Sequence, residues 1–211
     1  MAKTTVKKRT LTEEQILDAA LEILRENDRA ALTMRRVAQA CGVTPMALYH
    51  HINDKDTLAE RATDRIFQIA VDQFQQDANP WRKRLINLVC RLRSDLIAYP
   101  GTGEIFTSQA VIGPGTAATT EAFFVCISQA GLTGEALVEA ADAVTMLLIG
   151  SVANELTRPA RVRERLATPE TDHPTPLMAQ HLSRYANRDP DARFQQALNW
   201  LLDAVEQQAT A

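Results

Sequence analysis

The chain has 211 residues, 45% of them hydrophobic and 23% charged, which is typical of an ordinary globular protein long enough to bury a core. No apolar run approaches the roughly 20 residues of a membrane helix, and the basic start of the chain leads into polar residues, so neither a membrane span nor a signal peptide is expected. Cys41, Cys90 and Cys126 are too few and too scattered for a disulfide framework or a zinc site. We therefore expect a protein of the reducing cytoplasm with no metal and no cofactor.

The net charge of −3, taken alone, counts against nucleic acid as a partner. Its distribution changes that conclusion, because residues 1–60 are balanced and residues 61–211 carry the whole excess of acids. Residues 1–10 contain four basic side chains, Lys7 and Lys8 among them, and no acid. Such a leader is typical of an end that faces a polyanion, although basic tails are also common without such a role.

Apolar spacing and capping signals predict helices almost throughout and no strand, which gives an all-α fold. The expected helices cover about 12–26, 33–41, 44–51, 55–77, 80–98, 116–130, 134–157 and 191–208. Thr12, Thr33 and Asp54 are placed as helix caps, and Pro80 as a first helical residue. The glycine-bracketed stretch 101–115 is expected to be a connection with a short apolar piece inside it.

The most informative pattern lies at residues 33–51, where two short helices are joined by a three-residue turn around Gly42. A glycine can take the positive φ that such a turn requires, and Val37 and Leu48 are placed to lock the two helices together. This is the helix-turn-helix arrangement, which presents its second helix to the major groove of DNA. The alternative is a plain helical hairpin with solvated polar residues.

Residues 10–67 resemble the DNA-binding domain of the TetR family of bacterial transcriptional regulators, through the runs Leu32–Val43 and Leu48–Ile52. The resemblance implies an all-α homodimer with a three-helix DNA-binding head, here residues 1–53, and a larger helical effector-binding and dimerisation domain, here residues 54–211. The DNA contacts predicted by carrying the family's motif over are Thr33, Arg35, Thr44, Pro45, Met46, Ala47, Tyr49, His50 and Lys55, to which the basic leader adds Lys7 and Lys8.

The carried-over contacts suit their task chemically, because hydroxyl and basic groups hold phosphates while apolar and amphipathic groups contact base edges. The resemblance also implies a structural role for His51, which would close the head against the fourth helix.

Residues 79–157 are weakly similar to the effector domain of tetracycline repressors, with Trp81 near the start and Gly150 near the end of the similar features. Those repressors hold their drug as a magnesium complex through histidines. No histidine occurs here between His51 and His173. This departure counts against a metal–tetracycline complex as the effector, while the architecture is still expected.

Aromatic and methionine side chains recur at helical spacing between residues 61 and 157, where they either fill a core or line an apolar effector pocket. The predicted ligand-binding residues are Phe67, Phe74, Asn87, Phe106, Gln109, Phe123, Asp142 and Met146. Asp142 lies on an otherwise apolar helix, where it can pair with Arg91 or Arg93, face a cationic ligand, or remain in solvent.

Two apolar helices are predicted to form a homodimer, through residues 136–157 and, after a proline-rich connection, residues 191–208. A two-fold dimer places two heads about one DNA turn apart, which predicts a palindromic operator. The resulting hypothesis is a repressor that binds double-stranded DNA and is released by a small, largely apolar effector, with 101–115 as a moving element. An activator or a redox-responsive regulator with the same head remains an alternative. An enzyme is not expected, because catalytic clusters and phosphate-binding loops are missing from the sequence.

Overall fold

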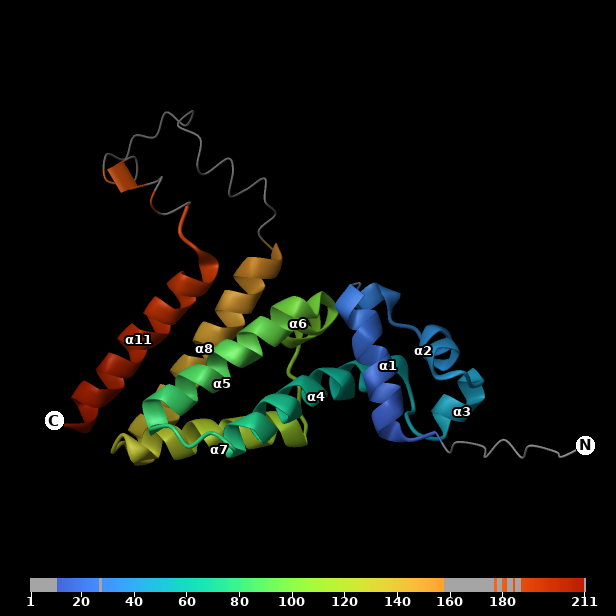
Figure 1. Ribbon diagram of the computed structural model, residues 1–211, viewed down its shortest axis with the longest axis horizontal. Helices are drawn as coiled ribbons and strands as arrows, with labels where there is room; N and C mark the ends of the chain where they lie inside the picture. The colour runs from blue at the N-terminus through green and yellow to red at the C-terminus, as the bar shows by residue number, and fades with distance from the viewer. Residues whose placement is uncertain are drawn as a thin grey trace, which may run out of the picture.

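The computed structural model describes residues 11–26, 28–157 and 187–210, with single residues at 177, 180, 181 and 184, and within these it contains helices and no strand (Figure 1). The elements are α1 (Glu13–Glu26), the 3-10 helix η1 (Arg29–Ala31), α2 (Met34–Cys41), α3 (Pro45–Tyr49), α4 (Lys55–Gln75), α5 (Trp81–Ala98), α6 (Pro100–Ser108), α7 (Pro114–Gln129), α8 (Gly134–Thr157) and α11 (Pro190–Ala209). The predicted all-α class is confirmed. Lys7, Lys8 and the proline-rich stretch 158–176 lie outside the described residues.

The molecule is elongated, with α1, α2 and α3 forming a head at one end (Figure 1). Helix α4 begins in this head and runs into the rest of the molecule, where it packs against α5, α6 and α7. Helices α8 and α11 contact each other on the side remote from the head. The single helix α4 is therefore part of both the head and the larger helical unit.

The capping side chains that the sequence predicts are present in the head. Thr12 and Gln15 exchange two hydrogen bonds of 3.3 Å, each backbone N–H donating to the other side chain. Thr33 accepts a backbone N–H in the first turn of α2 at 3.2 Å, and Asp54 accepts the N–H of Thr57 at 2.7 Å. This backbone N–H, followed by the Thr57 hydroxyl, lowers the pKa of the Asp54 carboxyl.

The predicted connection at 101–115 is wrong over much of its length, because α6 already begins at Pro100. The chain turns at Tyr99, whose carbonyl accepts the N–H groups of Thr102 at 2.8 Å and Gly103 at 3.1 Å. A Cβ on Gly103 would lie 2.6 Å from the carbonyl oxygen of Leu96 and 2.7 Å from a methyl of Leu156. Gly103 therefore permits close helix packing rather than marking a loop. Pro80 also differs, since it precedes the first helical residue of α5.

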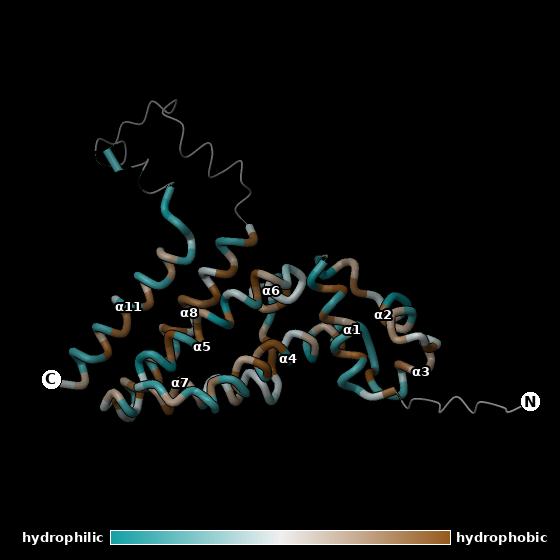
Figure 2. The backbone as a smooth tube through the Cα atoms, in the orientation of Figure 1, coloured by the Kyte–Doolittle hydropathy of each residue, from teal (hydrophilic) through white to brown (hydrophobic). Residues whose placement is uncertain are grey.

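Helix α8 is long and apolar enough to cross a membrane by length and composition alone, although the sequence predicted no apolar run of that length. Its most apolar 18-residue window has a mean hydropathy of 1.7, and 28% of that window is buried within the chain. Figure 2 shows hydrophobic residues recurring along α8. The helix nonetheless packs against α5, α6, α7 and α11 as one member of a helical bundle. Its exposed apolar side chains, Val138 and Met146, are not covered by the described residues.

A buried arginine ties the two apolar helices to the rest of the domain. The Arg93 guanidinium of α5 donates to the hydroxyl of Ser151 at 2.7 Å and forms ion pairs with Asp191 and, at 3.9 Å, with Glu155. It also lies over the ring of Phe194, 5.1 Å from the centroid. These contacts fix α8 and α11 to α5 with a single side chain.

The suggested pairing of Asp142 with Arg91 or Arg93 is wrong. Arg91 pairs with Asp95, one turn along α5, and Arg93 is occupied by partners on α8 and α11. Asp142 is exposed on the outer side of α8, as the solvent alternative required.

A buried carboxylate of α4 caps the start of α7. Asp64, which is 9% exposed, accepts the N–H of Gly115 at 2.9 Å and that of Thr116 at 2.7 Å. A Cβ on Gly113 would lie 2.5 Å from the carboxyl carbon of Asp64, and one on Gly115 would lie 2.4 Å from its carbonyl oxygen. The two glycines therefore let α7 approach α4 closely enough for the carboxylate to satisfy N–H groups that have no partner within α7.

We expect Asp64→Ala to lower the free energy of unfolding by about 2 kcal/mol, because it leaves two largely buried N–H groups without acceptors. Urea denaturation gives the measurement, and Asp72→Ala on the exposed side of α4 is the matched control, with an expected change within about 0.5 kcal/mol. Gly113→Ala should destabilise similarly by displacing the carboxylate. Equal stability of the Asp64 and Asp72 variants would contradict the capping role.

Candidate DNA-binding surface and effector pocket

The turn between α2 and α3 has the geometry that its sequence predicts. Gly42 adopts φ of 68°, and the N–H of Val43 donates to the carbonyl of Ala38 at 2.9 Å. Val37 and Leu48 are fully buried, so each short helix is anchored in the core of the head by one large side chain. The side of α3 opposite Leu48 is therefore exposed to solvent.

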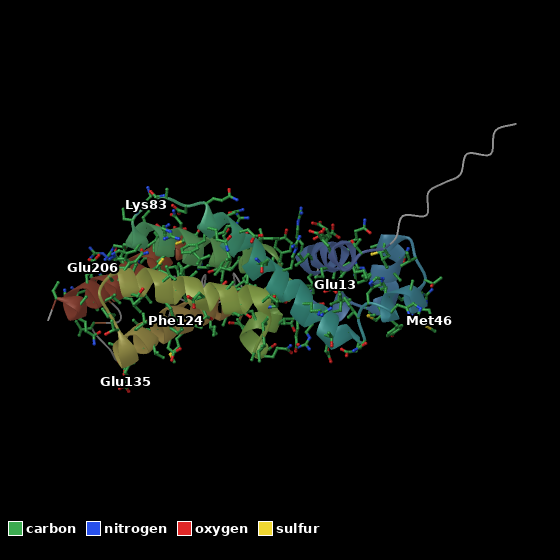
Figure 3. The ribbon with its side chains drawn as sticks, turned by 90° about the horizontal axis from the view of Figure 1, so that it is seen from below. Glu13, Met46, Lys83, Phe124, Glu135 and Glu206 are labelled. Atoms are coloured by element: carbon green, nitrogen blue, oxygen red, sulfur yellow. The ribbon has the colours of Figure 1, made fainter. Side chains whose placement is uncertain are left out.

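That free side of α3 carries two large, exposed side chains. Met46 is 69% and Tyr49 47% exposed, although both are substantially apolar. Figure 3 shows Met46 at the end of the head, remote from Glu135 and Glu206 at the other end of the molecule. Thr44 occupies the cap position of α3 but its side chain makes no capping bond, so its hydroxyl is available to another partner.

The predicted DNA contacts are placed as follows. Seven are exposed on the head, and two are half-buried at or next to helix starts. The exposed residues are Thr33, Arg35, Thr44, Pro45, Met46, Tyr49 and His50, and the half-buried ones are Ala47 and Lys55. The Thr33 hydroxyl caps α2. It therefore positions this helix in addition to being a predicted DNA contact.

The structural role implied for His51 is not supported, because its side chain is exposed. The neighbouring Ile52 is buried and closes the head in its place.

Several polar contacts join the head to the larger helical unit. Arg61 of α4 pairs with Glu13 of α1 at 2.9 Å. The side chain of Glu104 on α6 accepts the N–H of Arg29 in η1 at 3.1 Å. Helix α6 therefore contacts the head directly and not only through α4.

An apolar cavity of about 230 Å³ lies among α4, α6, α7 and α8, and we call it the aromatic cavity. It is lined by Phe67, Phe106, Gln109, Ala110, Val111, Thr116, Thr119, Thr120, Phe123, Thr145, Leu148 and Ile149. The rings of Phe67 and Phe106 lie 5.3 Å apart between centroids. Gln109 donates its side-chain amide to Glu60 of α4 at 2.9 Å. Four predicted ligand-binding residues, Phe67, Phe106, Gln109 and Phe123, thus meet at one cavity.

Two other predicted residues, Phe74 and Asn87, line a separate cleft of about 210 Å³ between α4 and α5. Its polar groups largely pair with one another. Asn87 donates to Asp77 at 2.8 Å, and the guanidinium of Arg84 lies 4.1 Å from the centroid of the Phe74 ring. The Nε of Arg84 is buried without a hydrogen-bond partner among the described residues.

The predicted placement of Asp142 and Met146 in the pocket is corrected, because neither residue lines the aromatic cavity. Thr145, Leu148 and Ile149 are the residues that α8 turns toward it. Asp142 and Met146 lie about one turn apart, on the solvent-exposed side of α8. That face is exposed, and Met146 is 70% exposed.

The sequence reasoning missed Asp64 and the threonines of the cavity wall. The signal for Asp64 was an acid on a face of α4 that otherwise carries buried apolar residues. The threonines gave no such signal, because their spacing is compatible with any partly buried helix.

The cysteine thiols are poorly suited to redox chemistry. Burial raises the pKa of Cys41 and of Cys90, and raises that of Cys126 to about 11. Thiolate is the reactive form, so a raised pKa makes a thiol less reactive at neutral pH. Within the described residues, no three His, Cys, Asp or Glu side chains are close enough together to hold a metal ion.

Comparison with protein families matches both parts of the chain. Residues 16–62 match the model for bacterial regulatory proteins of the tetR family, and residues 75–209 match the tetracyclin repressor-like C-terminal domain. The second match alone covers more than half of the chain.

Related proteins are regulators. The chain is 28% identical over 195 residues to the tetracycline repressor protein class A from transposon 1721 of Escherichia coli, covering 90% of this chain and 88% of that protein. It is 28% identical over 174 residues to an HTH-type transcriptional regulator of Saccharopolyspora erythraea, covering 78% and 72%.

Solved structures share the fold along the whole chain. ActR from Streptomyces coelicolor in complex with actinorhodin superposes with a TM-score of 0.78 at 21% identity, over 95% of this chain and 99% of that one. TetR from Acinetobacter baumannii gives a TM-score of 0.72 at 22% identity, over 94% and 98%. The helix-turn-helix head and the helical unit behind it, matched by both family models, show that this chain belongs to the TetR family of bacterial transcriptional regulators and is not an enzyme.

Proposed function

We propose that this regulator is a cytoplasmic repressor that binds a palindromic operator as a homodimer and leaves it when a small, largely apolar effector fills the aromatic cavity. The observation that carries the proposal is the head itself, where a buried Leu48 anchors α3 and leaves Met46 and Tyr49 in solvent. Exposed apolar side chains on a short helix after a helix-turn-helix turn suit contact with base edges.

The dimer is supported by the uncovered surface of α8 and α11. Val138, Met146 and Gly150 are exposed on α8 at intervals of eight and four residues, with the exposed Asp142 between the first two. On α11, Trp200 is 64% exposed. Large apolar side chains exposed on two adjacent helices are unfavourable in water and are typical of a protein interface. A second copy of this chain is the proposed partner.

We also propose that the boundary between the head and the effector domain lies between residues 53 and 54.

Release by an effector is supported by the position of the aromatic cavity. Its walls include α4, which begins in the head, and α6, which contacts η1 through Glu104. A ligand that fits the cavity better in one arrangement of these helices shifts the protein toward that arrangement. The heads of a dimer would then no longer match successive major grooves, and affinity for the operator would fall.

The relatives favour a repressor, since several of them are named as tetracycline repressors. An activator with the same head is the alternative, and it predicts the opposite sign of the change in target expression when the gene is deleted. A redox-responsive regulator is disfavoured by the raised pKa values of all three thiols.

We expect Arg35→Ala and Tyr49→Ala each to weaken binding to the promoter DNA beside the gene by about tenfold, the effect of losing one good DNA contact. Gel-shift titration measures this change. Arg25→Ala is the control, because Arg25 is exposed on α1 and pairs with Glu22 of the same helix. Unchanged affinity in both head variants would remove α3 as the DNA-binding surface.

Met146→Glu and Trp200→Glu should convert the dimer to monomers, because a buried, unpaired carboxylate opposes association. Sedimentation velocity measures the mass. Ile112→Glu is the matched control, since Ile112 is 86% exposed and lies outside α8 and α11. Dimers that persist in both variants at micromolar concentration would place the interface elsewhere.

Iodoacetamide should leave Cys126 unmodified in the folded protein at pH 7.5 and label it only as pH approaches its pKa of about 11. The raised value also means that burial of the neutral thiol stabilises the fold below pH 9.0 and that this contribution disappears as pH rises through about 11. Mass spectrometry follows the labelling, with the urea-unfolded chain as control. Rapid modification at neutral pH would restore the redox alternative.

A further inference from the structure

The cleft between α4 and α5 is lined by an arginine without an acceptor. Arg84 is half-buried, and its guanidinium forms no hydrogen bond or ion pair with the described residues. One edge of the group is enclosed, because Nε is buried, and the group lies over the ring of Phe74, 4.1 Å from the centroid. A guanidinium stays charged and presents a planar fork of N–H donors. Such a group is rarely left unpaired when it is partly buried.

Other half-buried or cleft-lining arginines of this region are paired within the chain. Arg65 forms an ion pair with an acid of α1, and Arg82 forms ion pairs with acids of α11. Arg91, which lines the same cleft as Arg84, pairs with Asp95 one turn along α5. Arg84 therefore differs from its neighbours in having no acid of the described chain as a partner.

Asp77 also lines the cleft, but its carboxylate is held by other groups. It accepts the side-chain amide of Asn87 at 2.8 Å, and the backbone N–H and side-chain amide of Asn79 at 2.9 and 2.6 Å. These donors occupy most of the positions at which a carboxylate accepts hydrogen bonds. The largest unused hydrogen-bonding capacity in the cleft is therefore the donor capacity of Arg84, which suits a ligand with an acceptor.

The other walls and charges of the cleft narrow the ligand further. Ala70, Phe74 and Leu88 are buried apolar residues of the lining, and they suit a compact apolar body. A carboxylate matches the guanidinium fork with two parallel hydrogen bonds. A dianion such as phosphate is less suitable, because the negative charge of Asp77 faces the same cleft.

We propose that the cleft between α4 and α5 is a second ligand-binding site, in which terminal N–H groups of Arg84 form paired hydrogen bonds with the carboxylate of a compact apolar acid. The cleft and the aromatic cavity share no lining residue. The inference therefore goes beyond the proposed effector site and does not depend on it. A ligand in the cleft contacts α4 and α5 together, so its binding stabilises the folded chain.

Benzoate and benzamide are matched probes, because they have the same ring and only benzoate carries a carboxylate. Isothermal titration calorimetry at constant ionic strength measures their affinities for the full-length protein. Arg84→Gln removes the charged fork, and Arg84→Lys keeps the charge without the fork. Lys83→Gln is the matched control, because Lys83 is exposed, precedes Arg84 and does not line the cleft. Circular dichroism establishes whether each variant folds.

The wild type is expected to prefer benzoate by about tenfold, the effect of a charge-assisted pair of hydrogen bonds. Benzoate should also raise its melting temperature more than benzamide does at the same concentration. Arg84→Gln should bind both probes equally, and Arg84→Lys should lose most of the preference. Lys83→Gln should keep the preference.

A preference that survives in Arg84→Gln, or that Lys83→Gln loses to the same extent, would overturn the assignment, because binding would then depend on another site or on net charge alone. A wild type that does not distinguish the probes would overturn the ligand class. Full preference in Arg84→Lys would overturn the paired hydrogen bonds, and this variant decides the question if Arg84→Gln does not fold. Gel-shift binding to the operator without any ligand tests the proposed function separately.

Discussion

The buried carboxylate of Asp64 joins the helix that begins in the head to a helix that forms a wall of the aromatic cavity. Its two hydrogen bonds to the start of α7 replace partners that α7 itself does not provide, and Gly113 and Gly115 leave room for this contact. Three residues further along α4, Phe67 lines the aromatic cavity, and one residue after Gly115, so does Thr116. The hydrogen bonds of Asp64 thus hold the cavity wall close to the point where α4 leaves the head. A displacement of this wall would therefore act on α4 close to the head.

Helix α6 provides a second connection between the head and the aromatic cavity, and this connection does not involve Asp64. Glu104 accepts a backbone N–H of η1, whereas Gln109, five residues later, bonds to Glu60 of α4. One short helix therefore contacts the head, α4 and the cavity. Gly103 allows α6 to pack tightly on α5 and α8, because any side chain there would collide with Leu96 or Leu156. The glycines of this region permit dense packing, and dense packing transmits displacement better than a flexible loop would.

A different buried side chain orients the helices at the end of the molecule remote from the head. Arg93 is buried and binds groups on both α8 and α11, which sets the orientation of the two helices. Their outer faces expose the large apolar side chains Val138, Met146 and Trp200, which no described residue covers. The same apolar character makes α8 resemble a membrane helix by composition. A second copy of the chain would cover this surface, and Asp142 would then lie at or near the interface rather than in the pocket.

The sequence by itself determined the helical fold, most helix starts and the head, because these depend on local signals such as the caps at Thr33 and Asp54 and the turn glycine Gly42. Four of the eight ligand-binding residues predicted from the sequence, Phe67, Phe106, Gln109 and Phe123, line one cavity. Only the tertiary structure separated Phe74 and Asn87 into another cleft and turned Asp142 and Met146 outward. Apolar spacing shows that a helix has a buried face, but the rotation of each helix against its neighbours decides whether a given residue meets core, cavity or solvent. That rotation is fixed by contacts between residues distant in sequence, such as Asp64 with Gly115 and Arg93 with Asp191.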